Sequence, residues 1–191
     1  MRIPRATRSA RGISLIELTV TVALLAFAAA VAVPNLTTTD PEKAGLAAER
    51  VAQALRFARS EALRRGVKTG VWVDYDHSDP GVGEVAVYRV DTSVTPAGRG
   101  EILRNPFSKQ PYDFDVSGNG LTDAAIAGAA PAFDCEGVGR RRAVQFDATG
   151  MPVCLDGAAR HRLLRGAIVI GAGGVVATVR IDPVTGRVEV R

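Results

Sequence analysis

The chain has 191 residues, of which 47% are hydrophobic and 23% charged, and its formal net charge is +4. This length allows one domain with its own core together with a short anchoring segment. Residues 1–12 contain four arginines and no acid, and the remainder has 20 Lys and Arg against 20 Asp and Glu. The overall basicity is therefore no argument for nucleic-acid binding, although residues 139–191 keep nine arginines against four acids.

An apolar run follows the basic leader. Residues 13–33 are apolar except for Ser14, Glu17, Thr19 and Thr21. As a helix the run would be roughly 31 Å long at ~1.5 Å per residue, which is close to the thickness of a bilayer core. A cleaved secretory signal with a site in AFAAAVAVP and a membrane anchor with a cytoplasmic N-terminus both fit this pattern. Neither explains Glu17, because an acid in a membrane helix usually has a partner and the run contains no Lys, Arg or His.

Cleavage after Gly12 would supply that partner. Ile13 would then carry a new α-amino group, and Glu17 lies one helical turn further along the same face. The basic leader followed by GISLIEL resembles the cleavage and methylation motif of type IV pilins and type II secretion pseudopilins. The resemblance implies that a prepilin peptidase, which is also the N-methyltransferase, cuts after Gly12 and methylates Ile13. It also implies that Glu17 sets the register between neighbouring subunits, although Ile replaces the more usual Phe as the first mature residue.

The segment after the apolar run predicts an interruption of the helix. Pro34 removes a backbone donor, three threonines follow, and Asp40 with Pro41 has the pattern of a new helix start. The sequence alone therefore predicts two helices, whereas the pilin resemblance implies one helix bent at Pro34. We expect the bend or break between residues 33 and 40.

A second, amphipathic helix is expected at residues 37–66. Gly66 is a suitable C-terminal stop, and Glu61 can pair with Arg65 at i,i+4. The apolar positions recur at helical spacing: Ala47, Val51, Leu55, Ala58 and Ala62. The ARSEA run near the end of this helix resembles the first helix of GspH minor pseudopilins and FimT-like minor pilins.

Beyond residue 66 the pattern is that of strands and turns. VKTGVWVDY and GEVAVYRV flank a turn-rich loop, and residues 91–138, which have weak periodicity, are expected to be a variable loop region with short strands. RAVQFD and MPVCL around ATG indicate a hairpin, AIVI and VVATVRI around GAGG indicate another, and DPVTG turns into RVEVR, a last strand. We expect an α+β, pilin-like fold in which a long N-terminal helix packs on an antiparallel sheet. The expected organisation is a cleaved leader (1–12), a transmembrane and filament-core helix (13–36), the helix of the head (37–66) and a β-rich periplasmic head (67–191).

The two cysteines, Cys135 and Cys154, are expected to pair if the head lies outside the cytoplasm, the alternative being two buried thiols. The loop between residues 74 and 84 contains enough acids to consider calcium, but it lacks EF-hand spacing, and a solvated loop is the preferred interpretation. We find no nucleophile motif or phosphate loop, and we predict neither an enzyme nor a cofactor nor a metal site.

Two functions remain after these exclusions. The first is a minor pseudopilin of the periplasmic filament of a type II secretion system. The resemblance implies partners that include other pseudopilins, the peptidase, the inner-membrane assembly platform, and secreted substrates or the outer-membrane secretin. The alternative is a minor pilin of a type IV pilus, for which the FimT-like resemblance implies DNA binding through a C-terminal G-R-x-R motif. The candidate DNA contacts are Arg140, Arg141, Arg142 and Arg187, but Glu189 stands where that motif has its second arginine.

Overall fold

The computed structural model describes residues 14–32, 39–74, 83–93, 98–118, 121, 123–127 and 132–191. The chain divides into two compact units, Met1–Thr38 and Thr39–Arg191, and each is described by itself. Gly12, Ile13 and Pro34 lie outside the described residues. The expected cleavage and methylation site and the expected kink therefore stay predictions.

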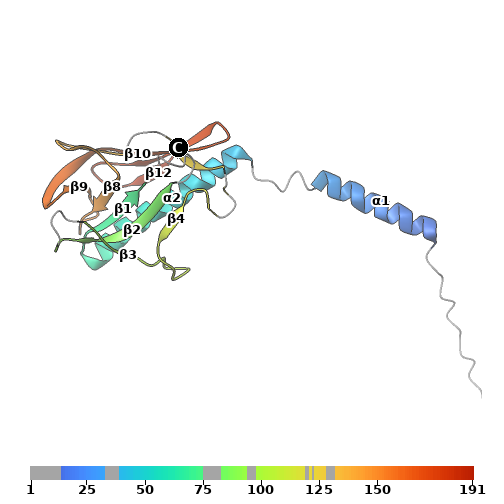
Figure 1. Cartoon of the computed structure of the whole chain (residues 1–191), viewed down its shortest axis with the longest axis horizontal. Coiled ribbons are helices and arrows are strands. Elements are labelled where there is room, and N and C mark those ends of the chain that lie inside the picture. Colours follow the sequence, from blue (N-terminus) through green and yellow to red (C-terminus); the bar gives the residue numbers. More distant parts are fainter. Residues whose placement is uncertain are drawn as a thin grey trace, which may run out of the picture. The chain divides into compact units, whose positions relative to one another are not determined.

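The first unit contains helix α1, Leu15–Ala32 (Figure 1). Thr19 and Thr21 lie within the helix, and their hydroxyls are satisfied there because they donate to the carbonyls of Ile16 and Leu18 at 2.8 and 2.9 Å. Within the part of the chain that the structure describes, no helix combines the length and the apolarity that crossing a membrane requires.

The second unit begins with helix α2, Asp40–Arg65. Its N-cap is Thr39, one residue before the expected Asp40, because the Thr39 N–H is held by Glu42 Oε2 at 2.9 Å in the manner of a capping box. The predicted stop at Gly66 is confirmed: this residue has φ +66°, and its N–H donates to the Ala62 carbonyl at 2.9 Å.

Among the described residues, twelve strands form one antiparallel sheet, which confirms the α+β class. Figure 1 shows this sheet with α2. Their order is β12-β11-β10-β9-β8-β1-β2-β3, while β4 also pairs with β2, β5 and β6 pair with β10, and β7 pairs with β6. The strands are β1 (Thr69–Val73), β2 (Glu84–Asp91), β3 (Gly98–Ile102), β4 (Asp113–Asp115), β5 (Ala125–Ala127), β6 (Phe133–Cys135), β7 (Gly139–Arg141), β8 (Ala143–Phe146), β9 (Pro152–Asp156), β10 (Ala159–Ala172), β11 (Val175–Ile181) and β12 (Val188–Val190).

Strand β10 connects the two halves of the sheet. With 14 residues it is the longest strand; its first part pairs with β9 and its last part with β11. Its pairing with β6 is irregular between Leu163 and Arg165. Before the irregularity the odd-numbered residue Leu163 faces the core, and after it the even-numbered residues Gly166 and Ile168 do. The irregularity thus shifts by one residue which side chains of β10 are buried. Arg165 and the neighbouring Leu164 are exposed as a result.

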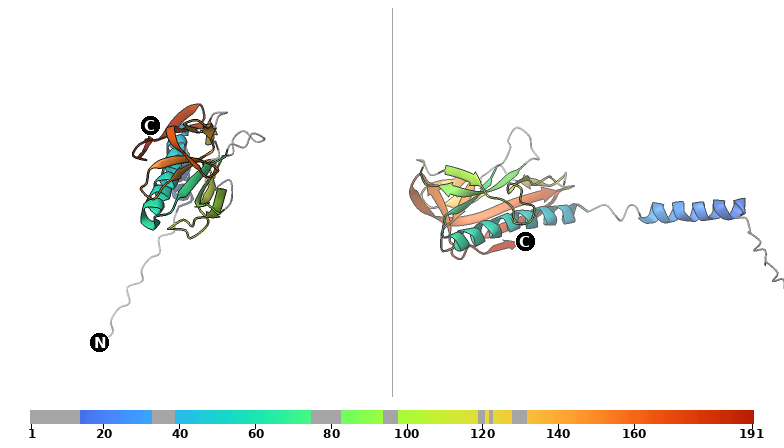
Figure 2. Two further views of the ribbon diagram at one scale, coloured as in Figure 1. Left: turned by 90° about the vertical axis from the view of Figure 1, so that its left-hand side faces the viewer. Right: turned by 90° about the horizontal axis from the view of Figure 1, so that it is seen from below.

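The core lies between α2 and one face of the sheet. Helix α2 packs along β1, β2, β8, β10, β11 and β12, and Figure 2 shows it running beneath the strands. All five predicted helix positions, from Ala47 to Ala62, are at most 1% exposed. Because the buried helix face is mostly alanine, larger side chains of the sheet fill the core, among them Val71, Val87, Phe146, Ile168 and Ile170.

Candidate functional site

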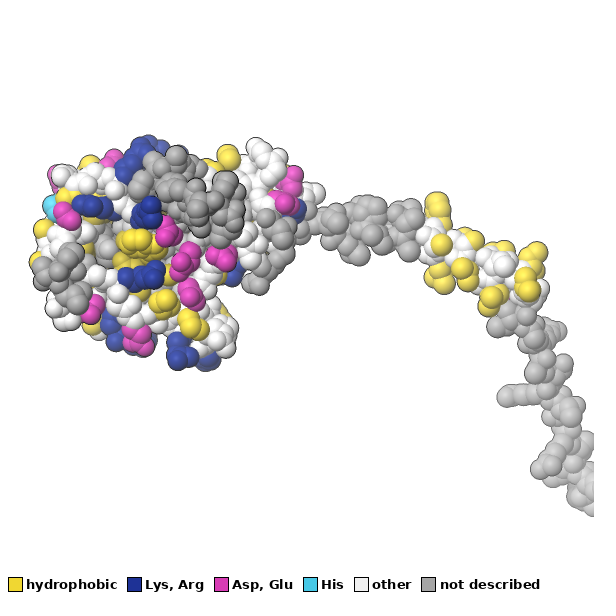
Figure 3. Space-filling view, viewed as in Figure 1, with side chains coloured by type: hydrophobic (Ala, Val, Ile, Leu, Met, Phe, Trp, Pro, Cys, Tyr) yellow, Lys and Arg dark blue, Asp and Glu magenta, His cyan; other side chains and the backbone are white. Residues whose placement is uncertain are grey.

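Glu17, the expected assembly residue, lies in the first turn of α1. Its N–H donates to the Ser14 carbonyl at 3.0 Å, and the side chain is exposed. Apart from Glu17 and two threonines, the described side chains of this helix are apolar, and the large ones are exposed, from Leu15 at 79% to Phe27 at 72%. The yellow atoms of Figure 3 show some of them on one face. A helix of this kind needs an apolar environment, either lipid or other helices, to cover it.

The ARSEA run places Glu61 at the end of α2, where it is 8% exposed. Arg64 binds its carboxylate through two nitrogens at 2.8–3.1 Å, and Arg65 Nε lies 2.5 Å away, which confirms the predicted i,i+4 pair. Burial acts to raise the pKa of Glu61, but the hydrogen bonds and charges of the two arginines lower it overall. The run therefore has a structural role at the last turn of the helix.

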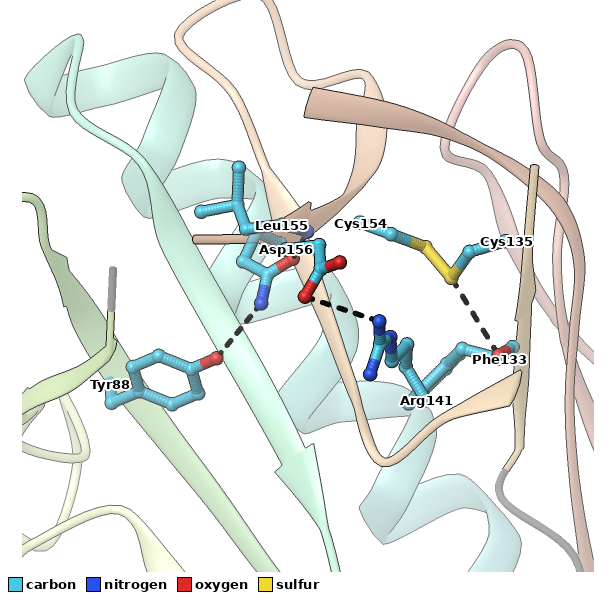
Figure 4. Close-up of a disulfide and its surroundings, with 8 residues drawn as sticks. Tyr88, Phe133, Cys135, Arg141, Cys154, Leu155 and Asp156 are labelled. Atoms are coloured by element: carbon cyan, nitrogen blue, oxygen red, sulfur yellow. Dashed lines mark hydrogen bonds and ion pairs between the residues drawn. A yellow bond between two sulfur atoms is a disulfide. The ribbon is translucent and has the colours of Figure 1, made fainter. Parts of the chain in front are cut away.

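A disulfide joins Cys135 on β6 to Cys154 on β9, with 6.1 Å between the Cα atoms (Figure 4). Both residues are at most 2% exposed. Beside this bond, Arg141 reaches across to Asp156 at 3.2 Å. The disulfide thus links two strands that both pair with β10, next to the arginines that the sequence singled out.

The Gly139–Arg142 segment is not a free cationic cluster. Arg141 pairs with Asp156, Arg142 Nη1 lies 2.5 Å from Asp74, and Arg140 is exposed on β7. On the face shown in Figure 3, basic and acidic side chains are interspersed. Two of the three arginines are thus engaged within the head, which weakens the case for phosphate binding by this segment.

Arg187, in contrast, lies beside a groove of about 420 Å³ on the C-terminal strands. The groove is lined by four arginines, Arg165, Arg180, Arg187 and Arg191, together with Asp182 and Glu189. Sequence reasoning missed three of these arginines. Outward alternation along β11 indicates Arg180, but the irregularity in β10 that exposes Arg165 leaves no local signal.

The two carboxylates reduce the positive charge of this groove. Glu189 lies 3.4 Å from Arg187 and 3.1 Å from Arg191. Asp182 accepts hydrogen bonds from Thr185 and Val184, and the bonds from Thr185 are the main reason that its pKa is lowered. The four arginines could hold a carboxylate or phosphate, but Asp182 and Glu189 in the same lining oppose the binding of a second anion. Among the described residues, no group of three or more His, Cys, Asp or Glu is placed to hold a metal ion.

The comparison with protein families decides the classification. The family described as "Type II transport protein GspH" matches residues 47–186, which is most of the chain. The chain belongs to the GspH family. The match covers α2 from Ala47 onward and the sheet up to the turn before β12, and it confirms the expected membership of the type IV pilin and pseudopilin superfamily.

Two crystal forms of the type IV minor pilin FimU from Pseudomonas aeruginosa are similar to this GspH family member. The P65 form has a TM-score of 0.42 and 15% identity over 77% of this chain and 91% of FimU. The P21 form has a TM-score of 0.44 and 16% identity over 78% of this chain and 87% of FimU. No functional inference follows from similarities at this level. A search of curated protein sequences finds no match to the chain.

Proposed function

We propose that this protein is a minor pseudopilin, a structural subunit of the periplasmic pseudopilus of a type II secretion system. The observation that carries the proposal is the GspH family match over residues 47–186, combined with GISLIEL after a basic leader. The family covers the head, and the motif covers the segment before it. Two independent parts of the chain therefore support the same function.

In this proposal the N-terminal unit anchors and assembles the protein. The prepilin peptidase removes residues 1–12 and methylates Ile13, and residues 13–33 hold the subunit in the inner membrane with the head in the periplasm. The assembly platform then transfers the subunit into the filament beside other pseudopilins. There the N-terminal ammonium of a neighbour docks on Glu17, since a buried pair of this kind fixes register better than it adds stability. Secreted substrates and the secretin are the further partners.

The processing step is the first test. Protein isolated from membranes should begin at Ile13 and carry one N-methyl group, as seen by N-terminal sequencing and intact mass. Gly12→Ala should leave the leader in place. A mature chain that begins near Ala30 or Val31 would instead identify a secretory signal and contradict the pilin-like mechanism.

The second test is the register role of Glu17. Glu17→Ala should preserve cleavage and membrane insertion but reduce co-purification with the other subunits, because the partner ammonium loses its acceptor in an apolar environment. Thr21→Ala, one turn further along the same helix, is the matched control and should assemble normally. Equal co-purification of the Glu17→Ala variant and the wild type would contradict the register role.

DNA uptake as a FimT-like type IV minor pilin is the second candidate, and the groove with four arginines favours it. Binding through phosphates should fall steeply with salt and weaken on Arg187→Ala for all sequences alike. Arg140→Ala with Arg142→Ala tests the other segment. We expect no micromolar binding at physiological salt, because Glu189 and the ion pairs oppose phosphate. Tight binding abolished by Arg187→Ala would favour DNA uptake over secretion.

A further inference from the structure

The connection between β3 and β4 carries the most exposed large apolar side chain of the described chain. Phe107 is 93% exposed, at the end of a projecting loop whose sides are joined by a bridge between Arg104 and Pro111. The residues at the base of this loop, Leu103 and Tyr112, are buried in the core. The loop is thus fixed to the head at its base and presents an uncovered aromatic ring.

Hydrogen bonds hold the loop in one conformation. Asn105 Oδ1 accepts from the N–H groups of Phe107 and Ser108 at 2.9 and 3.3 Å, and the Asn105 N–H donates to the Gln110 carbonyl at 2.8 Å. Lys109 has φ +61°, which is uncommon for a residue other than glycine, and its ammonium donates to the Pro106 carbonyl at 2.6 Å. Because the loop is ordered before any contact is made, little conformational entropy is lost when Phe107 is buried by a partner.

A cationic groove adjoins the same loop. Its volume is about 340 Å³, and it lies between the last turn of α2 and the residues around β3. Two acids lie in its lining: Glu61 is bound by Arg64 and Arg65, and Glu101 lies 3.8 Å from Arg89. The lining contains five basic residues: Arg64, Arg65, Arg89, Arg104 and Lys109. The exposed ring of Phe107 therefore lies on a loop that borders a groove with more basic than acidic side chains.

We propose that the Arg104–Pro111 loop and this groove form a docking surface for the head of a different minor subunit, one that presents an apolar pocket bordered by carboxylates. Phe107 enters the pocket, and the carboxylates face the arginines and the lysine of the groove. The identity of the partner as a filament subunit rests on the proposed function. Aromatic anchors of this kind supply a large share of the binding free energy at protein interfaces.

A second copy of this chain does not offer the required pocket on its described grooves. The groove at the C-terminal strands has four arginines and two acids. Another, of about 180 Å³, has an apolar lining that includes Met151 and Val184, but its charged residues are Arg160 and Arg162. Docking of the cationic loop on either groove would bring like charges together, which is unfavourable. The charge pattern therefore favours a different chain.

The experiment uses tryptophan emission, because the chain has a single tryptophan, Trp72. In the full chain, Phe107→Trp places a reporter at the exposed tip, and Val184→Trp, at a position 61% exposed, is the control. Each of the other minor subunits of the same filament, and this chain itself, is added in turn. One different subunit should shift the emission of the Phe107→Trp protein to shorter wavelength and leave the control unchanged.

Charge and anchor variants complete the test. In the Phe107→Trp protein, Arg89→Gln should weaken the association and reduce its dependence on salt, whereas Arg162→Gln should not. Phe107→Ala should weaken binding at least tenfold in a competition assay. A shift with this chain itself, or with no subunit, would overturn the inference. Normal processing at Ile13 in the same protein would then show that the processing step of the proposed function is intact and that only the docking inference has failed.

Discussion

Gly70 is a residue for which the neighbouring strand leaves no room for a side chain. It lies opposite Tyr88 in the β1–β2 ladder, and a Cβ at this position would approach the Tyr88 hydroxyl oxygen to 2.6 Å and Cε2 to 2.8 Å. Tyr88 is 3% exposed, and its hydroxyl accepts a hydrogen bond from Gln145 Nε2 at 3.2 Å. The ring therefore cannot move away without breaking a buried contact.

Gly70→Ala should accordingly lower the free energy of unfolding by about 1–3 kcal/mol, as overpacking in a filled interior does. Gly45→Ala on α2 is the matched control: a Cβ there has open space, and the change should stabilise the helix by up to about 1 kcal/mol. Urea unfolding of both variants measures the two effects. A neutral Gly70→Ala substitution would mean that Tyr88 does not pack over this residue.

At the level of single residues, the sequence predicts interactions between near neighbours in the chain and misses those between distant ones. The pair of Glu61 and Arg65 and the stop at Gly66 follow from helical spacing alone. The pairs of Arg142 with Asp74 and Arg141 with Asp156 depend on how the strands are ordered. That order also determines which arginines share a groove, so only Arg187 of the predicted contacts lies in it.

Among the elements, the β10–β11 hairpin and the start of α2 depend on each other. Ala172 pairs with Val175 across a two-residue turn in which Gly173 and Gly174 have φ +54° and +86°. A Cβ on Gly173 would overlap the carboxylate of Asp40, the first residue of α2. The turn therefore needs glycine at this position both for its backbone conformation and for its contact with the helix.

Gly173→Ala should destabilise the head by more than about 1 kcal/mol, since it combines a positive φ with a steric overlap. Gly174→Asn should cost less, because the space around Gly174 is open and asparagine tolerates the left-handed conformation. Thermal unfolding by circular dichroism compares the two variants. Equal losses would show that the contact with Asp40 has no energetic consequence.

The predicted order of helix, hairpins and last strand is confirmed where turn residues mark it. The two predicted hairpins, β8–β9 and β10–β11, turn at the expected glycine-containing segments ATG and GAGG, because positive φ restricts the residue type. The hairpin between them, β9–β10, was not predicted. Residues 91–138 were correctly expected to hold short strands, but β3 to β6 could not be placed, since strands of three to five residues show too few alternations. The Phe107 loop lies in this region and was missed for the same reason.

At the scale of the whole molecule, the two units differ in what they need to be stable in water: the first exposes apolar side chains, and the second has its own core. Most described side chains of α1 are exposed and apolar, so this unit requires other molecules to cover it. The unit from Thr39 to Arg191 contains the buried cluster of α2 and the sheet, together with the disulfide. Its folding should therefore be independent of the N-terminal unit.

The head expressed from Thr39 onward should remain soluble and unfold in one cooperative transition, with the Cys135–Cys154 bond intact. The bond closes a loop over a sequence separation of 19 residues, which contributes roughly 3 kcal/mol in the chain-entropy model. Reduction, or Cys135→Ala with Cys154→Ala, should lower the midpoint of thermal unfolding by roughly 10 °C for a unit of this size. Reductant should have no further effect on the double variant, which is the internal control. An unchanged midpoint would show that packing around β6 and β9 holds these strands without the bond, and an insoluble head would show that folding depends on the N-terminal unit.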